Sequence, residues 1–338
     1  MRPPPRLLPR LASPARPSPW TRIAAATAQI LPFPQPSRTL GTTPRVHHNP
    51  SATTHSSPSS STSSVNETEI SHFSALASSW WDPHGPSRPL HLMNPLRHDF
   101  IRACLSSSSS RDSTSPTTPT GLRYLDVGCG GGIFAESAAR LPTTHSVTAI
   151  DPSPTILAVA RAHAKRDPFL LLPHSSSSSS SSSSNNNNNN NTGEPRLTYL
   201  NATIETLALP ARPADRFDVV SVFEVVEHVD YPAAFLDRVG EFVRPGGWLV
   251  LSTIARTWTS WLTTKLVAED LLGVVPRGTH DWDKYINEGE LRAYFEGKGG
   301  LWGPPRVMGV VYVPGLGWKE VRGSEKVGNY FFGVQRVG

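Results

Sequence analysis

The chain contains little cysteine and no long apolar segment. Its 338 residues include only two cysteines, Cys104 and Cys129. A domain held together by several disulfides is therefore excluded, and a reducing compartment fits the composition. No apolar run approaches the roughly eighteen residues that a membrane-spanning helix requires. If the chain meets a membrane, we expect it to lie on the surface of the bilayer.

Acidic residues and lysine are absent from the first 66 positions. This segment holds seven arginines among many Pro, Ser and Thr residues, and the first acid is Glu67. An arginine-rich, acid-free segment is typical of a mitochondrial presequence, and it has too little apolar surface to fold alone. The alternative is a disordered tail, because prolines interrupt an import helix except around residues 20–31. We predict a leader over residues 1–66 and a folded domain over residues 67–338.

The positive charge of the chain belongs mainly to this leader. The whole sequence has 32 basic and 27 acidic residues, and removing the seven leader arginines leaves 25 basic residues against the same 27 acids. The remainder is close to neutral. The composition therefore gives no indication of nucleic-acid binding.

A glycine-rich stretch follows the first apolar run. That run ends in Asp126-Val127, four glycines occur within residues 128–132, and a helix-like segment follows over 133–141. Glycine permits backbone conformations that a Cβ forbids, so the N–H groups around Gly128 and Gly130 can approach a nucleotide-like ligand. The Lys-Ser/Thr pair of a phosphate-binding loop is missing. A dinucleotide site and a turn without ligand stay open, but Asp126-x-Gly128-x-Gly130-x-Gly132 resembles the first motif of the S-adenosylmethionine (SAM) methyltransferases.

Strand-like and helix-like segments alternate after residue 120, which is typical of a parallel sheet covered on both faces. The predicted strands span residues 122–127, 146–150, 197–200, 217–223, 248–253, 307–313 and 327–334. The last two are predicted to form an antiparallel edge hairpin across the Gly/Pro turn at 314–317. Low-complexity tracts at 106–120 and 174–192 are predicted to be solvated loops. We therefore predict an α/β, Rossmann-like fold with a seven-stranded, mostly parallel sheet and helices on both faces.

Ligands of such sheets lie at the carboxyl ends of the strands, beside the point where the strand order reverses. Asp151 ends the second strand about twenty residues beyond the glycines, where a carboxylate can accept hydrogen bonds from two ribose hydroxyls. The alternative is a helix N-cap, because Pro152-Ser153-Pro154 follow. Phe223 ends the fourth strand and is predicted to flank the methionine part of the ligand. Adenine contacts are expected near Asn201.

Two helices are predicted before the glycine stretch. Apolar residues at helical spacing over 70–77 indicate a lid or cap helix, and Trp80-Trp81 end this apolar pattern. A second helix is predicted over 95–104, because proline is tolerated in a first turn. Arg97 lies at the start of this helix, where it either meets a carboxylate or is a solvated surface residue.

The most specific signal comes from strings spread along the chain. They are Trp80-Trp81-Asp82, Pro89-Leu90-His91-x-x-Asn94-Pro95-Leu96-Arg97, Phe217-Asp218-Val219-Val220, Glu224-Val225-Val226-Glu227-His228-Val229, Pro245-Gly246-Gly247 and Pro276-x-Gly278-Thr279-His280-Asp281-Trp282. With the glycine stretch they resemble the ubiquinone-biosynthesis O-methyltransferases, from around residue 70 to the end, apart from the low-complexity tracts. The resemblance implies a class I methyltransferase fold and SAM contacts from Arg97, Gly128, Asp151 and Phe223.

The same resemblance implies a substrate and a location. The expected acceptor is a polyprenyl catechol, either polyprenyl-dihydroxybenzoate or demethylubiquinol, which is methylated on a hydroxyl. The expected location is the matrix side of the mitochondrial inner membrane, as a peripheral protein beside other ubiquinone-biosynthesis proteins.

Glu224, Glu227 and His228 follow the fourth strand at i, i+3 and i+4, which places them on one face of a helix. Two carboxylates and an imidazole suit Mg²⁺ or another divalent ion, and the resemblance implies metal ligands here. A metal that bridges both catechol oxygens would orient the acceptor and lower the pKa of its hydroxyl. The alternative is a metal-free site in which the acids favour the helix N-terminus and His228 acts as a base, beside Glu227.

Residues 256–276 interleave Trp, Leu and Val with charged residues. An amphipathic helix with tryptophans near one end suits the surface of a bilayer, where a polyprenyl substrate is confined. The alternative is a helix that packs in the core. Thr279-His280-Asp281 follow directly and are expected at the mouth of the pocket, with His280 as a second candidate base.

Other functional classes fit less well. NAD-dependent reduction is disfavoured by the order of the glycines and by the lack of a catalytic Tyr-Lys or His dyad. A non-catalytic SAM-binding scaffold subunit would not require Asp126, Asp151 and the Glu/Glu/His set together. A methyltransferase for another small-molecule phenol is the remaining alternative to the predicted enzyme.

Overall fold

The computed structural model describes residues 63–108, 120–172, 195–255, 285–313 and 315–337. The chain divides into two compact units, Met1–Thr62 and Ser63–Gly338, and every described residue belongs to the second unit. Several predicted segments lie outside the described residues: most of the leader, most of the tract at 106–120, the whole tract at 174–192, the segment 256–276 and His280. The expectations for these segments therefore stay predictions.

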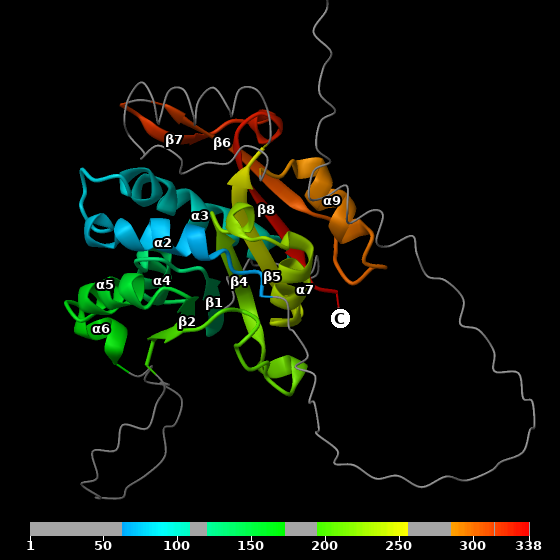
Figure 1. Cartoon of the computed structure of the whole chain (residues 1–338). Helices are drawn as coiled ribbons and strands as arrows, with labels where there is room; N and C mark the ends of the chain where they lie inside the picture. The colour runs from blue at the N-terminus through cyan, green and yellow to red at the C-terminus, as the bar shows by residue number, and fades with distance from the viewer. Residues whose placement is uncertain (1–62, 109–119, 173–194, 256–284, 314, 338) are drawn as a thin grey trace, which may run out of the picture. The chain divides into compact units, whose positions relative to one another are not determined.

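The described residues form one mixed sheet of eight strands, in the order β3-β2-β1-β4-β5-β8-β6-β7 (Figure 1). The strands are β1 (Leu122–Val127), β2 (Thr144–Asp151), β3 (Leu197–Asn201), β4 (Phe217–Phe223), β5 (Val243–Ile254), β6 (Arg306–Val313), β7 (Gly317–Glu320) and β8 (Asn329–Gln335). The first five pair in parallel, and β8, β6 and β7 pair antiparallel with their neighbours. The strand order reverses at β1 and β4, which creates a switch point at their carboxyl ends.

The predicted fold class is confirmed, but the predicted strand number of seven is wrong. The additional strand is β7, which pairs with β6 from Val313 opposite Gly317 to Val310 opposite Glu320. The turn after β6 therefore leads into β7, whereas β8 lies between β5 and β6. The sequence pattern missed β7 because four half-buried or exposed residues are too few to show an alternating period.

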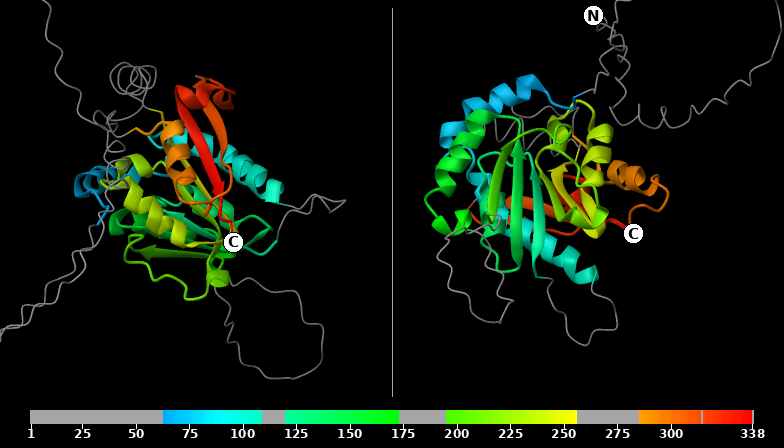
Figure 2. Two further views of the ribbon diagram at one scale, coloured as in Figure 1. Left: turned by 90° about the vertical axis from the view of Figure 1, so that its right-hand side faces the viewer. Right: turned by 90° about the horizontal axis from the view of Figure 1, so that it is seen from below.

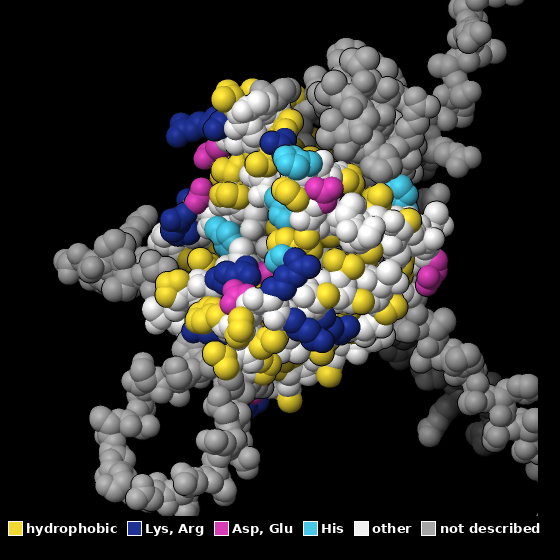
Figure 3. Space-filling view, turned by 90° about the vertical axis from the view of Figure 1, so that its left-hand side faces the viewer, with side chains coloured by type: hydrophobic (Ala, Val, Ile, Leu, Met, Phe, Trp, Pro, Cys, Tyr) yellow, Lys and Arg dark blue, Asp and Glu magenta, His cyan; other side chains and the backbone are white. Residues whose placement is uncertain are grey.

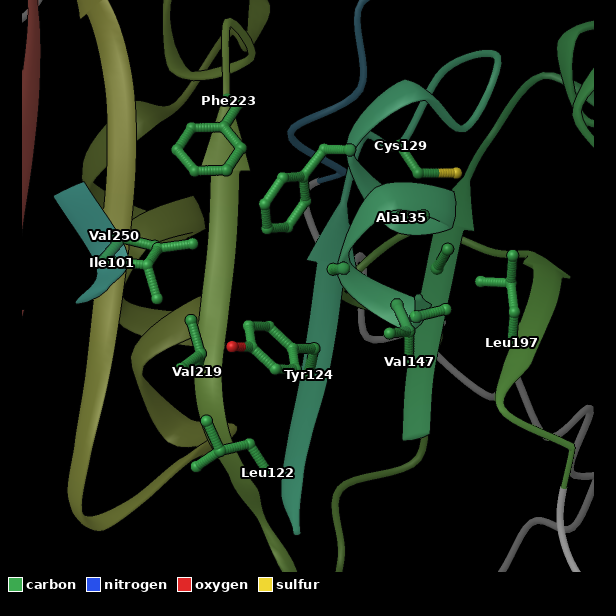
Figure 4. Packing of buried hydrophobic residues seen from close by; sticks show 14 of the residues in the cluster. Ile101, Leu122, Tyr124, Cys129, Ala135, Val147, Leu197, Val219, Phe223 and Val250 are labelled. Carbon is green, nitrogen blue, oxygen red and sulfur yellow. The ribbon is translucent and has the colours of Figure 1, made fainter. Parts of the chain in front are cut away.

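The interior of the sheet explains why the central strands are apolar along their whole length. In β4, Val219, Val220 and Val222 are fully buried, as expected for a parallel strand that is covered on both faces. Figure 4 shows side chains of neighbouring strands beside one another, among them Tyr124, Val147 and Val219. β-branched and aromatic residues fit this pleated, buried surface well.

Helices cover both faces of the sheet (Figure 2). They are α2 (Glu67–Ala75), α3 (Arg88–Ser108), α4 (Ile133–Ala139), α5 (Pro154–Ala164), α6 (Pro168–Leu171), α7 (Pro232–Glu241) and α9 (Glu288–Glu296), with 3₁₀ turns η1 (Ala77–Ser79), η2 (Pro213–Asp215), η3 (Val226–His228) and η6 (Ser324–Lys326). Along the described parts of the chain, no helix combines the length and the apolarity needed to cross a membrane.

Helix α3 differs from its prediction at both ends. It begins at Arg88 rather than Pro95 and continues to Ser108, into the tract that was predicted to be a loop. Pro95 lies inside the helix, where its ring removes one backbone hydrogen bond. The buried side chains of Met93, Arg97 and Phe100 hold both sides of this position in the fold, so packing outweighs the local propensity.

Candidate functional site

A cavity of about 740 Å³ lies at the carboxyl ends of β1, β2, β4 and β5. Its walls come from the glycine turn, from the ends of these strands, from α2 and from the start of α3, with β6 and β7 at one end. This is the position at which doubly wound sheets hold their ligands. All predicted site residues that are described line this cavity: Arg97, Gly128, Gly130, Asp151, Phe223, Glu224, Glu227 and His228.

On the face of the domain shown in Figure 3, no single type of side chain among the described residues forms a separate patch. Basic, acidic, histidine and apolar side chains are mixed on this face rather than gathered by type.

The glycine turn requires glycine for two separate reasons. Gly128, Gly130 and Gly132 have φ values of 71°, 53° and 87°, which L side chains rarely adopt. In addition, a Cβ on Gly130 would lie 2.4 Å from Trp80, and one on Gly131 would lie 2.1 Å from the same ring. The turn thus combines left-handed backbone with direct contact between bare backbone and an indole.

Trp80 and Trp81 bind the N-terminal segment to this turn. The Trp81 indole N–H donates to the carbonyl oxygen of Gly131 at 2.9 Å, and its ring stacks on His163 at 3.4 Å. The ring Nε2 of His91 lies 2.9 Å from the carbonyl oxygen of Trp80. Both tryptophans therefore contact the glycine turn.

Asp151 connects the end of β2 to the glycine turn. Its Oδ2 accepts a hydrogen bond from the Gly130 N–H at 3.0 Å, and its Oδ1 accepts one from the Ser153 N–H at 2.9 Å. The helix N-cap that was considered for Asp151 is instead Ser153, whose side chain accepts from Ile156. Burial raises the pKa of Asp151, and the two N–H donors oppose this shift. Each carboxylate oxygen keeps lone pairs for a ligand hydroxyl.

Arg97 is a buried cation that faces the cavity from α3. Only 4% of the residue is exposed, and its Nε has no hydrogen-bond partner among the described residues. Its guanidinium carbon lies 4.9 Å from the centre of the Phe223 ring. Burial lowers the pKa of Arg97, whereas the carboxylates of Glu224 and Asp126 oppose that shift. A buried guanidinium with unused donors is suited to a ligand carboxylate.

Asp126 is buried beneath the glycine turn, at the end of β1. Its Oδ1 accepts a hydrogen bond from the Ser221 hydroxyl at 2.7 Å. Burial raises the pKa of Asp126 to about 7, although Ser221 and the charge of Arg97 oppose the shift. A cationic ligand would favour the ionised form of this carboxyl group.

The Glu/Glu/His set lies in the cavity, but not on one helix face as predicted. Glu224 has a φ of 55°, and only the short 3₁₀ turn η3 (Val226–His228) follows it. Helix α7 begins later, at Pro232. Glu224 Oε1 accepts from the Ser252 hydroxyl at 2.7 Å, and Glu227 Oε2 accepts from the Thr253 hydroxyl at 3.1 Å. Both acids are therefore held against the end of β5.

The donor atoms of Glu224, Glu227 and His228 suit a divalent cation, but their positions do not form a metal site. Burial raises the pKa of Glu227 to about 7, and the nearby carboxylate of Glu224 adds to the shift. Two neighbouring carboxylates with an imidazole are the donors that a hard cation accepts. Among the described residues, however, no three His, Cys, Asp or Glu side chains meet in a metal-holding arrangement.

Glu69 on α2 was missed from the sequence and contacts His228 directly. Its Oε2 lies 3.1 Å from His228 Nδ1, and this is the one hydrogen bond of the ring within the described chain. Phe73, one turn further along α2, meets the ring edge-on at 4.9 Å. Burial lowers the pKa of His228, but the hydrogen bond to Glu69 and the charges of Glu227, Glu69 and Glu224 outweigh it and raise the pKa. Residues of α2 thus fix the orientation of the His228 ring.

The expected adenine side contains a second contact with the segment around α2. Glu205 Oε1 accepts a hydrogen bond from the Ser64 hydroxyl, and Glu205 Oε2 is buried without a partner among the described residues. The amide of Asn201 donates to the carbonyl oxygens of Asp151 and Pro152 at 3.0 and 2.9 Å. Asn201 is therefore engaged with the backbone of the β2 end.

Comparisons with known proteins identify this chain as a methyltransferase, and its curated relatives narrow the family. A protein-family model described as a methyltransferase domain matches residues 97–299. The ubiquinone biosynthesis O-methyltransferase, mitochondrial, of Candida albicans is 38% identical over 309 residues, which cover 81% of this chain and 86% of that protein. The protein of the same name from Schizosaccharomyces pombe is 38% identical over 284 residues, with 81% and 87% covered. The ubiquinone biosynthesis O-methyltransferase of Cereibacter sphaeroides is 38% identical over 232 residues, with 69% and 81% covered.

Proposed function

This chain belongs to the family of ubiquinone biosynthesis O-methyltransferases, and we propose that it transfers a methyl group from SAM to a hydroxyl of a polyprenyl catechol, such as polyprenyl-dihydroxybenzoate or demethylubiquinol. The observation that carries the proposal is a single cavity with two sets of groups. One set, Arg97, Asp151 and the glycine turn, suits a charged nucleoside. The other set, Glu224, Glu227 and His228, suits a phenol that loses a proton.

The nucleoside set accounts for each polar part of SAM. Asp151 accepts hydrogen bonds from the ribose hydroxyls, and Arg97 binds the methionine carboxylate with its unused donors. Phe223 flanks the methionine part beneath Arg97. Asp126 is a buried acid near the same end, and its charge complements the sulfonium. When bound, SAM supplies the methyl group as an electrophile.

His228 is the proposed base. Glu69 accepts from Nδ1–H, which leaves Nε2 unprotonated and available to the acceptor hydroxyl. Nε2 takes the hydroxyl proton while the phenolic oxygen bonds to the methyl carbon, and the electrons of the broken carbon–sulfur bond go to sulfur. Glu227 is the second proposed catalytic residue, because its raised pKa lets it exchange a proton near neutral pH.

Mg²⁺ is a further part of the proposal. Glu224, Glu227 and His228 would hold it, and the ion would orient two catechol oxygens and acidify one of them. A metal bound through His228 Nε2 would exclude that nitrogen as the base, which leaves His280 as the second candidate. Turnover with and without a chelator separates the two arrangements.

The proposed location is the matrix side of the mitochondrial inner membrane. Support comes from the arginine-rich composition of residues 1–66 and from the word mitochondrial in the names of two yeast relatives. We further propose that residues 256–276 contact the lipid surface, because their sequence interleaves tryptophan and aliphatic residues with charges. Other ubiquinone-biosynthesis proteins are the proposed partners there.

The proposal is tested with the full chain, SAM and a short-chain demethylubiquinol. We expect Asp151→Ala to lose SAM binding in equilibrium dialysis. Glu227→Ala should keep SAM binding within about twofold and lose methyl transfer, because we assign this side chain, which Thr253 holds at the end of β5, to the acceptor. Asp99→Ala, an exposed acid outside the cavity, is the matched control and should change neither. SAM binding without transfer to any catechol or phenol would instead identify a scaffold subunit.

A further inference from the structure

The cavity continues beyond the candidate catalytic residues into an apolar arm. We define this arm by Leu90 on α3, Val310, Val311 and Tyr312 on β6, Trp318 on β7, and Val327 before β8. Figure 1 shows the β6–β7 hairpin beside α3. None of these six residues belongs to the groups assigned to SAM, which are Arg97, Asp151, Phe223 and the glycine turn.

The arm is a fixed feature of the fold. The Trp318 indole N–H donates to the carbonyl oxygen of Pro89 at 2.9 Å, which ties the hairpin to the first turn of α3. Tyr312 packs edge-on against the same indole at 5.4 Å. Trp318 and Met308 in turn pack against the main core. The two walls therefore keep their spacing without a ligand.

The arm is lined mainly by apolar side chains, which favour an apolar occupant. The cavity residues contributed by the start of α3, by β6, by β7 and by the approach to β8 carry no charged side chain: Pro86, Ser87, Pro89, Leu90, Met93, Val310, Val311, Tyr312, Trp318, Val327, Gly328 and Asn329. A polar ligand group placed there would lose its water with few hydrogen bonds in return. An apolar chain gains from burial in the same place.

The arm also opens to the surface. Val311 and Val327 line it and are 38% and 46% exposed. The whole cavity has the volume of an ordinary small-molecule site. It can therefore enclose the first units of a long chain while the remainder leaves between these two valines.

We propose that the apolar arm binds the ring-proximal isoprene units of the acceptor. This inference rests on the proposed function, because the tail is the part of a polyprenyl catechol that the Glu/Glu/His set does not use. With the tail in the arm, the hydroxyl-bearing ring lies between the arm and the glycine turn. The arm then positions the acceptor along the cavity and sets a requirement for at least one isoprene unit.

The test compares catechol acceptors with zero, one and two isoprene units on the full chain. In the wild type, KM should fall by roughly tenfold or more with the first unit, since each buried methylene is worth about fourfold in affinity. Val311→Glu places a charge in the arm and should abolish this gain while leaving KM for the tail-less acceptor unchanged. Val327→Glu repeats the test from the opposite rim, and Leu316→Glu, which is 68% exposed and outside the cavity, is the matched control.

The outcomes distinguish the arm from the function. SAM affinity equal to that of the wild type establishes that each variant is folded. If the tail gain persists in both rim variants, or if KM rises equally for tailed and tail-less acceptors, the arm does not bind the tail and the methyl transfer stands. If no catechol is methylated by the wild type, the proposed function and the arm fail together.

Discussion

Removal of the Glu69 carboxylate tests whether helix α2 holds the candidate base. Glu69→Ala deletes the acceptor at 3.1 Å from His228 Nδ1, and Glu69→Gln keeps an acceptor oxygen without its charge. The side chains of Glu69 and His228 are 21% and 17% exposed. A hydrogen bond to a charged group contributes about 1.5–3 kcal/mol when well shielded, so we take the lower end. We therefore expect kcat to fall by about tenfold for Ala and by a few-fold for Gln.

The assay separates orientation of the ring from a loss of structure. Helix α2 keeps other anchors, because the Asn66 side chain donates to Asp230 at 2.8 Å and the Ser74 and Ser153 hydroxyls lie 2.7 Å apart. The SAM dissociation constant of Glu69→Ala should therefore stay within about twofold of the wild type. Glu67→Ala, an exposed acid on the same helix, is the matched control and should have wild-type kcat.

A pH profile gives a second readout. The hydrogen bond from Glu69 helps to raise the pKa of His228 against the effect of burial, so its loss lowers that pKa. Because the base acts in its neutral form, the acidic limb of the kcat profile should move to lower pH in Glu69→Ala. Wild-type kcat in Glu69→Ala, an unmoved limb, or an equal loss in Glu67→Ala would refute the role of Glu69.

Two further predictions concern the cofactor end. Gly131→Ala places a Cβ 2.1 Å from Trp80 and should weaken SAM binding at least tenfold, measured by calorimetry. The control Gly289→Ala in α9 meets no atom within 4 Å and should stabilise the fold by about 0.5–1 kcal/mol. Equal SAM affinities of the two variants would contradict this account of the turn. Burial raises the pKa of Asp126 to about 7 in the folded state, from a value near 4 in the unfolded state. Between these pH values the folded state binds more protons than the unfolded state. The free energy of unfolding should therefore fall as pH rises from 4 to 7, by at most about 4 kcal/mol. Urea unfolding of Asp126→Asn should lack this contribution, and parallel pH curves for both proteins would show that burial does not shift Asp126.

The strand–turn–helix unit at residues 122–139 was predictable because its signals are local. An apolar run, glycines at required positions and a helical period follow one another directly in this short stretch of sequence. The same applies to Asp151, whose place at a strand end follows from the alternation of elements. Here the predicted and observed boundaries of β1 coincide.

The acceptor end was less predictable because its geometry depends on backbone that spacing does not reveal. Glu224, Glu227 and His228 have helical spacing, yet the positive φ of Glu224 interrupts the helix. The available signal was Pro232, which occupies the first turn of α7 and marks a later start. The pairing of Glu69 with His228 joins residues 159 positions apart, which no local pattern reports.

The contact of Trp80 with Gly130 and Gly131 has a practical consequence for spectroscopy. The Trp80 indole lines the cavity beside Gly130 and Gly131, so it is an intrinsic fluorophore next to the proposed nucleoside site. The chain has nine tryptophans, so the difference in emission between wild type and Trp80→Phe isolates this one ring. Cofactor arrival is then followed optically, without a label and without turnover.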